Sequence, residues 1–319
     1  MRGYDVVVIG RGAAGLSAAL VLSRARRSVV VVDAGEPRNA PAAHMHGYLS
    51  RDGLPPSDLL AAGCAEVTGC GGELLTGTVS AIAGEVGSGF DVVLGSGDRL
   101  TARRALVATG LRDELPDIGG LWERWGRDVL HCPYCHGYEV RDQPLGVLGG
   151  SQESVAHGLL LAQWSSDVMF FAHSTELNGE QREQLAARGV EIVEGLVSRV
   201  VVENDELAGV EAGGRVVARA AVFVRPRFVP NAELLVSLGC AADADGWVTV
   251  DPTGATSVPG VLGAGNVVNP RAQVITAAGE GSAAAIAINA DLVVEDVAEQ
   301  VQRHRLRHRL RPPPVGSLS

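Results

Sequence analysis

Short apolar stretches alternate along the chain with longer stretches in which small and apolar residues recur at helical spacing. Near the N-terminus this pattern predicts a strand over Val6 to Ile9, a helix ending near Arg24, and a strand over Val29 to Val32. At mid-chain it predicts a strand over Leu145 to Leu148, a helix over Gln152 to Trp164, and a strand over Val168 to Phe171. Shorter strands are expected around 190–193, 196–202 and 222–224. We therefore expect an α/β fold with two Rossmann-like, doubly wound, three-layer units of the nucleotide-binding type.

The first predicted strand enters a glycine-rich turn, Gly10-Arg-Gly12-Ala-Ala-Gly15, and the second strand is followed by Asp33. Gly10 permits a tight turn, Gly12 lets the backbone approach a pyrophosphate, and Gly15 lets helix and strand pack closely. Asp33 stands at the separation, roughly 20 residues, at which an acid binds a ribose hydroxyl. Strand, turn, helix, strand and acid in this order predict a dinucleotide-binding site.

The mid-chain stretch His-Cys-Pro-Tyr-Cys-His-Gly-Tyr carries the second chemical signal. Cys132 and Cys135 have the Cys-x-x-Cys spacing, which can interconvert between a disulfide and a dithiol and so carry two electrons. A helix usually begins at such a motif, and its positive end lowers the thiol pKa. Pro133 suits the first helical turn, where its missing N–H would be unpaired anyway. We expect redox chemistry at this pair.

A zinc site is the competing interpretation of the same stretch. His131 and His136 would then supplement the two cysteines as ligands. The remaining Cys64, Cys70 and Cys240 form no second Cys-x-x-Cys, so the four ligands of a tetrahedral site are hard to find. We expect no metal.

Two further segments decide which dinucleotide is bound. Val258 to Asn266 reads as a strand that enters a glycine turn, and Arg271 to Gly281 opens a helix of small residues. With the first fingerprint, Ala108-Thr109-Gly110, the Cys-x-x-Cys pair and Pro230-Asn231, these segments resemble the flavoprotein disulfide reductases nearly from end to end. The resemblance is closest to the low-molecular-weight thioredoxin reductases, and it implies FAD as the cofactor and a homodimer.

In that family the C-terminal segment closes over the ribityl chain and the flavin ring. The resemblance therefore places Asn266 at the ribityl hydroxyls, and Gln273 and the following helix start near the ring, where a helix N-terminus stabilises negative charge. The family usually has Asp at the position of Asn266, but both side chains accept a hydroxyl hydrogen bond. The FAD-binding residues expected in all are Gly10, Gly12, Ala13, Ala14, Gly15, Asp33, Ala108, Thr109, Gly110, Gly265, Asn266, Gln273 and Val274.

The order of these segments predicts a discontinuous FAD domain. Residues 1–112 and 245–319 would build it, and residues 113–244 would form a central domain that carries the Cys-x-x-Cys pair. From Gln300 the sequence turns to alternating arginine, histidine and leucine. We expect a helix end with a solvated basic tail, and an arm that reaches a partner subunit is the alternative.

Composition narrows the functional classes. The net charge of −10 argues against nucleic acid as the main partner, and all 27 basic residues are arginine, which excludes Schiff-base chemistry and a lysine phosphate loop. The first strand begins so early that we expect no signal peptide, and no apolar run approaches the ~20 residues needed to cross a bilayer. Five cysteines, an odd number, suit a reducing cytoplasm.

The central domain departs from the thioredoxin reductases where they bind NADPH. In the turn Gly149-Gly150-Ser151, Ser151 replaces the third glycine, and Glu153 brings negative charge near the expected phosphates. After the next strand, a 2′-phosphate would meet Glu176 instead of an arginine pair. We therefore expect a degenerate NADPH-binding fold.

Without NADPH, the dithiol can run in the opposite direction, from a substrate dithiol to FAD and then to dioxygen. This combination resembles the thioredoxin reductase-like dithiol oxidases of gliotoxin, romidepsin and holomycin, whose Cys-x-x-Cys is followed by His-Gly and an aromatic residue, as at His136-Gly-Tyr138. The lysine-free sequence favours the holomycin-type dithiolopyrrolone oxidases. The resemblance implies that Cys132 forms a mixed disulfide with a small-molecule dithiol and that Cys135 faces the flavin.

His136 is the candidate base, since an imidazole with an ordinary pKa near ~6.5 can take a thiol proton at neutral pH. A capping or packing histidine is the alternative. His131 is a weaker second candidate, and His44 and His46 are expected either at the flavin edge or in a structural role. The aromatic residues that could form a substrate wall, or pack in the core, are Trp122, Trp125, Tyr134 and Tyr138.

Two other functions stay open. One is a reductase of a thioredoxin-like protein, fed by NADPH or ferredoxin. The other is a flavin-bound protein that sequesters thiols for self-resistance without turnover.

Overall fold

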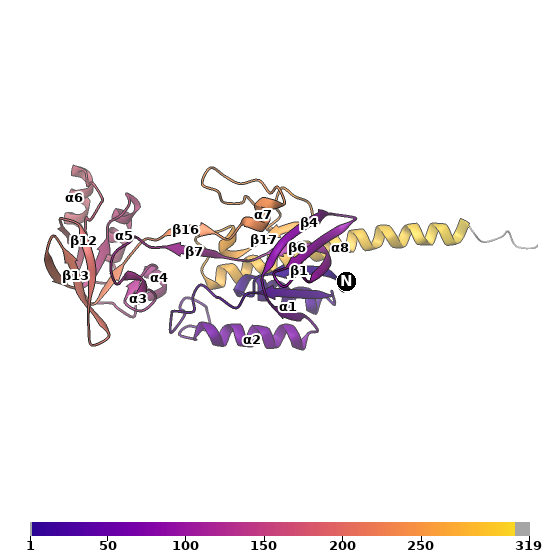
Figure 1. Ribbon diagram of the computed structural model, residues 1–319, viewed down its shortest axis with the longest axis horizontal. Helices are drawn as coiled ribbons and strands as arrows, with labels where there is room; N and C mark the ends of the chain where they lie inside the picture. Colours follow the sequence, from indigo (N-terminus) through magenta and orange to yellow (C-terminus); the bar gives the residue numbers. More distant parts are fainter. Residues whose placement is uncertain (1, 310–319) are drawn as a thin grey trace, which may run out of the picture.

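The computed structural model, which describes residues 2–309, has an α/β fold with two Rossmann-like units, as the sequence predicts (Figure 1). The larger unit holds a seven-stranded sheet in the order β3-β2-β1-β6-β5-β4, with β17 paired to β6. Its strands are β1 (Arg2–Ile9), β2 (Val29–Asp33), β3 (Glu73–Thr76), β4 (Val79–Glu85), β5 (Gly89–Leu94), β6 (Arg99–Val107) and β17 (Val261–Gly263). Its helices are α1 (Ala13–Arg24), α2 (Pro56–Gly69), α7 (Glu233–Ser237), the 3-10 helix η1 (Gly265–Val267) and α8 (Val274–Arg309).

The smaller unit is built on a five-stranded parallel sheet in the order β11-β10-β9-β15-β8. A three-stranded antiparallel sheet, β12-β13-β14, packs against it through a shared apolar core. The strands are β8 (Val129–Leu130), β9 (Leu145–Leu148), β10 (Val168–Phe171), β11 (Val190–Val193), β12 (Val197–Glu203), β13 (Glu206–Ala212), β14 (Arg215–Ala218) and β15 (Ala221–Phe223). The helices are α3 (Leu121–Arg124), α4 (Pro133–His136), α5 (Glu153–Leu161) and α6 (Gly179–Ala187).

Two antiparallel strands, β7 (Leu111–Glu114) and β16 (Arg227–Pro230), run side by side between the two units (Figure 1). They carry the chain out of the larger sheet and back to it. A change in the relative orientation of the two units therefore requires a change in the backbone of these two strands.

The hydrophobic pattern predicts most strand bounds and the end of α1 at Arg24, but not the start of β1 or the end of α5. The strands expected at 145–148, 168–171 and 190–193 have these bounds, whereas β1 starts earlier than expected, at Arg2. Helix α5 ends at Leu161 instead of Trp164, because Trp164 N–H donates to the carbonyl of Leu161 at 2.9 Å, in the tighter pattern that ends many helices. Strand β1 is buried on both faces and so reads as a continuous apolar run.

Helix α8 corrects one expectation about membranes. Between Val274 and Arg307 it is long and apolar enough to cross a bilayer by length and composition, although no such stretch was expected. Its first half packs against α1 in the core, where a Cβ on Gly281 would lie 2.0 Å from the carbonyl oxygen of Ala14. A core helix meets the same criteria, so the finding is weak evidence for a membrane. The helix continues past Gln300 with exposed side chains at 301–307, and the end of the basic tail lies outside the described residues.

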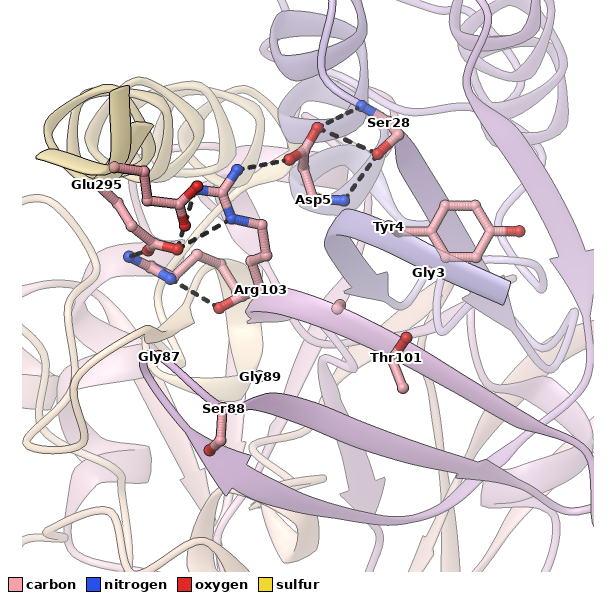
Figure 2. A pocket seen from close by; sticks show the side chains of 13 residues that line it. Gly3, Tyr4, Asp5, Ser28, Gly87, Ser88, Gly89, Thr101, Arg103 and Glu295 are labelled. Atoms are coloured by element: carbon pink, nitrogen blue, oxygen red, sulfur yellow. Dashed lines mark hydrogen bonds and ion pairs between the residues drawn. The ribbon is translucent and has the colours of Figure 1, made fainter. Parts of the chain in front are cut away.

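Ion pairs hold the middle of α8 to the sheet. Arg104, which is 2% exposed, donates to Asp291 and Glu295 at 2.6 Å each. Arg103 lies between Asp5 and Glu295 at the wall of a cavity of about 460 Å³ (Figure 2). This cavity lies at the amino end of β1, whereas the Cys-x-x-Cys pair belongs to the smaller unit.

Candidate active site

Cys132 and Cys135 form a disulfide with their Cα atoms 5.2 Å apart. Cys132 is the N-cap of α4 and Pro133 its first residue, so the helix begins where the motif predicts. The helix has only four residues, however, so its dipole stabilises a thiolate less than the dipole of a longer helix would. Both cysteines are half-buried.

The disulfide meets the larger unit at the start of α8. Gln273 Nε2 donates to Cys135 Sγ at 3.8 Å, although 138 residues separate the two in the chain. A Cβ on Gly47 would lie 3.8 Å from Gln273 Oε1, so the loop after β2 also reaches this point. The side chain that the family resemblance assigns to the flavin edge thus lies beside Cys135, the cysteine expected to face the flavin.

His136 is half-buried at the end of α4. Burial, and secondarily the positive charge that His46 can carry, lowers its pKa, while Glu139 acts in the opposite direction. At neutral pH the imidazole is therefore neutral and able to accept a proton. Its role as the base stays a prediction.

His131 is placed differently. Its Nδ1 lies 3.2 Å from the carbonyl oxygen of Val224, and its ring packs edge-on against Phe228 at 5.0 Å. Burial lowers the pKa of His131 to about 4. Its neighbour His157 is also buried, and neither ring nitrogen of His157 has a hydrogen-bond partner. These contacts favour a packing role for His131.

His44 and His46 lie in one loop but make different contacts. His44 is exposed, with its Nδ1 3.0 Å from the carbonyl oxygen of Gly53. His46 lies between Asp52 and Glu139, with nitrogen–oxygen distances of 3.3 and 3.5 Å. The sequence alone does not point to this contact, because Glu139 is in the smaller unit.

A second contact fastens the same loop to the two strands that connect the units. Arg38 donates two hydrogen bonds of 2.7 Å to Asp113 on β7, and its guanidinium lies 5.2 Å from the ring centre of Phe228 on β16. Asp113 is buried, and a bidentate pair with arginine is geometrically specific. Neither Arg38 nor Asp113 was expected from the sequence.

Of the four aromatic residues that could form a substrate wall, none is fully buried in the core. Trp122, Tyr134 and Tyr138 are exposed, and Trp125 is half-buried. Tyr134, inside the motif, packs edge-on against Trp164 with ring centres 5.6 Å apart. It is thus fixed next to both cysteines with a face open to solvent.

The glycine turn of the larger unit has the shape that a dinucleotide requires. Gly10 has a φ of +106°, and a Cβ on Gly15 would lie 1.9 Å from the Gly10 carbonyl oxygen. Gly12 caps α1, and a Cβ added to it would have no atom within 4 Å, which leaves open space at the helix N-terminus. Asp33 accepts hydrogen bonds of 2.7 Å from the N–H groups of Arg11 and Gly35. Ala13 and Ala14 form the first turn of α1.

The remaining expected cofactor residues lie near the carboxyl ends of β6 and β17. Ala108 N–H donates to Ile9, and Thr109 and Asn231 exchange hydrogen bonds of 2.7 and 3.0 Å. These contacts hold Gly110, which has a φ of +71°, at the exit toward the smaller unit.

Asn266 is held by its amide group. Its Nδ2 donates to the carbonyls of Asn269 and Ala272 at 2.9 and 3.0 Å, which leaves Oδ1 to accept a hydroxyl. Gly265 N–H donates to Glu280 at 2.9 Å, a contact that was not expected from the sequence. Val274 is the first residue of α8. These residues fit an FAD, and their individual roles stay predictions.

The second glycine turn, in the smaller unit, makes different contacts. A hydrogen bond with Ser151, followed by one from its own backbone, lowers the pKa of Glu153, so this carboxylate is ionised at neutral pH. His173, two residues after β10, accepts a hydrogen bond of 3.0 Å from the N–H of Val197. Glu176 is exposed. Among residues 2–309, no three His, Cys, Asp or Glu side chains gather in a way that would hold a metal ion.

A glycine turn shaped for a dinucleotide, together with a Cys-x-x-Cys disulfide beside Gln273 at the start of α8, defines a flavin-dependent oxidoreductase that acts on sulfur groups. The chain belongs to the pyridine nucleotide-disulphide oxidoreductase family, whose model matches residues 4–281, and FAD is its cofactor. It is similar to HlmI, whose crystal structure matches with a TM-score of 0.93 and 58% identity over 96% of this chain and 97% of HlmI.

Other relatives agree with this assignment. An oxidoreductase from Agrobacterium tumefaciens has 36% identity and a TM-score of 0.86, over 92% of this chain and 99% of its own. The thioredoxin reductase sirT of Leptosphaeria maculans is 31% identical over 315 residues, which cover 92% of this chain and 96% of sirT. The protein is thus a thioredoxin reductase-like flavoenzyme.

Proposed function

We propose that the protein is a dithiol oxidase that closes an intramolecular disulfide in a small natural product, of which a holomycin-type dithiolopyrrolone is the favoured kind. The observation that carries this proposal is the contact of Gln273 Nε2 with Cys135 Sγ at 3.8 Å, in a motif whose Tyr134 is exposed. The contact supports a role for Cys135 on the cofactor side, and the exposed aromatic ring supports access for a small substrate. The 58% identity to HlmI over nearly the whole chain supports the same function.

The residues divide the chemistry as follows. His136 takes the proton of the first substrate thiol, and the thiolate attacks Cys132 Sγ. The Cys132–Cys135 bond breaks, a mixed disulfide forms at Cys132, and Cys135 leaves as a thiolate. The second substrate thiolate then attacks the substrate sulfur of the mixed disulfide, which releases the cyclic disulfide and leaves both cysteines reduced.

The cysteines must then lose two electrons. Bound FAD supplies a two-electron acceptor that dioxygen can reoxidise, so that one dithiol and one dioxygen give one disulfide and one hydrogen peroxide. Gln273 positions Cys135 for this step, and Asn266 and the turn from Gly10 to Gly15 would hold the cofactor. We also propose a homodimer that works in the cytoplasm, with neither nucleic acid nor membrane as a partner.

The test is anaerobic stopped-flow absorbance of the FAD-loaded protein. We expect dithiothreitol to bleach the flavin and air to restore it with release of hydrogen peroxide. We expect NADPH to leave the flavin oxidised, because Ser151 stands in the second glycine turn and the ionised Glu153 beside it would repel a phosphate. Fast bleaching by NADPH would instead support a thioredoxin reductase, the activity for which several relatives are named.

The base is tested in the same instrument. His136→Ala should slow flavin reduction by dithiothreitol about 10²- to 10⁴-fold, the usual contribution of a positioned base. Because the pKa of His136 is lowered, the imidazole stays neutral as the pH falls through 6.5. Wild-type activity should therefore persist below pH 6.5 and fall only at a lower pH. A variant with the wild-type pH–rate profile would contradict this role, and Cys132→Ser should be inactive at every pH.

A further inference from the structure

One arginine of the larger unit contacts both of the strands that connect the two units. Arg38 donates two hydrogen bonds of 2.7 Å to the carboxylate of Asp113 on β7, and its guanidinium carbon lies 5.2 Å from the ring centre of Phe228 on β16. Asp113 and Phe228 are register partners in this strand pair. Arg38 therefore holds the two strands at the same level, one through its carboxylate and the other through its aromatic ring.

The contact with Asp113 is of a kind that fixes geometry. The side chain of Asp113 is 6% exposed and that of Arg38 is 33% exposed, so most of the solvent is kept away from the pair. A shielded, bidentate pair restricts the orientation of both side chains more than a single exposed ion pair does.

The segment around Arg38 also reaches the smaller unit. A Cβ on Gly126, two residues after α3, would lie 2.9 Å from the Cβ of Pro41. Ala40 N–H donates to the carbonyl of Pro37 at 3.0 Å and closes a turn that contains Arg38 itself. The position of Arg38 is thus set by its own turn and by the packing beside it.

From Phe228 the contacts continue to the redox pair. The ring of His131 packs edge-on against that of Phe228, and its Nδ1 lies 3.2 Å from the carbonyl oxygen of Val224. Val224 and Phe228 both belong to the stretch of chain that leads from β15 into β16. Because His131 directly precedes Cys132, a shift of β16 would move the motif as well.

The redox pair touches the larger unit at Gln273, whose Nε2 lies 3.8 Å from Cys135 Sγ. One hydrogen bond to a sulfur is too weak to fix the orientation of a whole unit. The placement of Cys135 at the start of α8 therefore depends on other contacts, and the contacts of Arg38 restrain both connecting strands.

We propose that Arg38 is a positioning residue: with Asp113 and Phe228 it fixes the connecting strands, so that Cys135 stays beside Gln273 while the reduced cysteine pair passes its electrons to the cofactor. This inference rests on the proposed dithiol oxidase. In this role Arg38 contacts neither the substrate nor the cysteines. Its removal should therefore slow the step that needs both units in place, and not the exchange between substrate thiolate and disulfide.

The experiment separates these two steps in FAD-loaded Arg38→Met. The protein is mixed anaerobically with saturating dithiothreitol, free cysteine thiols are counted after alkylation by mass spectrometry, and flavin reduction is followed by absorbance. We expect the Cys132–Cys135 disulfide to open at the wild-type rate. The flavin should bleach about 10- to 100-fold more slowly, because a misplacement of about 1 Å can cost about 10²-fold in rate. A reduced cysteine pair should thus accumulate beside an oxidised flavin.

Three further variants control for a loss of stability. Arg112→Met removes a neighbouring arginine of β7, whose carboxylate contacts with Glu114 and Glu233 are 3.7 Å long, and it should keep the wild-type rates. Arg38→Lys keeps the charge toward Asp113 without the bidentate geometry, and should recover part of the lost rate. Arg38→Met/Asp113→Asn leaves no unpaired carboxylate buried, and should bleach as slowly as Arg38→Met although it is the more stable protein.

A second readout does not depend on turnover. Small-angle X-ray scattering of the oxidised, FAD-loaded proteins reports the relative placement of the two units. The distance distribution of Arg38→Met should be broader than that of the wild type, because the smaller unit is then free to take several orientations. The distribution of Arg112→Met should match the wild type.

The outcomes separate the two proposals. Wild-type bleaching, or an unchanged distance distribution, in Arg38→Met would overturn the positioning role and leave the oxidase standing. Equal slowing of disulfide opening and of flavin reduction would assign Arg38 to general stability and also overturn the positioning role. A wild-type flavin that dithiothreitol cannot bleach would overturn the oxidase and the role of Arg38 in its reaction, even if the scattering of Arg38→Met changes.

Discussion

The two units begin with the same succession of strand, glycine turn, helix and strand, but only the larger one keeps the features that face a ligand. A Cβ on Gly10 would lie 2.3 Å from the carbonyl oxygen of Ala108, and a Cβ on Gly149 would lie 2.5 Å from that of Ala172. Both turns therefore retain the glycine that lets one backbone pass close to the next strand. Packing preserves this glycine whether or not a nucleotide binds.

The positions that would face a phosphate differ. Two residues after the first glycine, the larger unit has Gly12 with open space around it, whereas the smaller unit has Ser151. At the end of the second strand, the larger unit has Asp33, bonded to the turn itself. The smaller unit has His173, two residues after β10, whose ring accepts a hydrogen bond from β12 instead. Packing can thus keep a fold whose ligand-facing residues have changed.

The largest effect is expected at the glycine that packs helix against strand. Gly15→Ala places a methyl group 1.9 Å from the Gly10 carbonyl oxygen, a contact between two backbones that cannot both stay in place. We expect a loss of more than about 3 kcal/mol in the free energy of unfolding, and protein without FAD. Gly150→Ala in the smaller unit, where a Cβ would have no atom within 4 Å, should be neutral. Urea unfolding gives the stability of the two variants, and absorbance gives their FAD content. Equal stability of Gly15→Ala and Gly150→Ala would contradict the expectation that only Gly15 is required for close packing.

An exchange of side chains at the ligand-facing position should have a smaller effect. Gly12→Ser meets no protein atom, so the apoprotein should melt at the wild-type temperature. Its FAD affinity should fall about 10- to 100-fold, since the added side chain occupies the space of the pyrophosphate at a cost of about 1–3 kcal/mol. The reverse change, Ser151→Gly, should not create NADPH binding, because the ionised Glu153 remains. Fluorescence titrations with FAD and NADPH measure both affinities. Tight NADPH binding by Ser151→Gly would show that this one side chain accounts for the difference in nucleotide binding between the units.

Local features of the sequence predict much of this molecule. The bounds of β9, β10 and β11, and the helix start at Pro133, follow from nearby residues. The apolar runs of buried parallel strands and the missing N–H of proline act over a few positions. These features also predict the position of the redox pair at a helix start.

Contacts between segments far apart in the sequence could not be predicted in the same way. Arg38 meets Asp113 across 75 residues of sequence, and His46 meets Glu139 between units that no local pattern relates. Charged and polar side chains of this kind are common on any surface, so only the relative placement of the two units reveals their partners. His136 could accordingly be found from its motif, whereas most of what surrounds it could not.

The last comparison concerns how each unit treats a buried polar side chain. Arg104 in the larger unit is fully paired with two carboxylates, whereas His157 in the smaller unit has no hydrogen-bond partner. Burial lowers the pKa of His157 and of His131 to about 4. In the unfolded chain both titrate near ~6.5, so the unfolded state binds more protons between pH 6.5 and pH 4. Stability should be constant above pH 6.5 and fall below it, by about 2 kcal/mol per histidine at pH 5.

His157→Leu tests this assignment. Leucine has a similar volume and needs no hydrogen bond, so the free energy of unfolding at pH 7.5 should stay within about 1.5 kcal/mol of the wild type. At pH 5 the variant should be the more stable protein, because it no longer holds a neutral imidazole that the unfolded state would protonate. Thermal melts of the FAD-loaded proteins at the two pH values give the comparison. Parallel losses of stability in both proteins would show that the acid sensitivity arises elsewhere, since the only group removed is the unpartnered ring between His131 and Phe223.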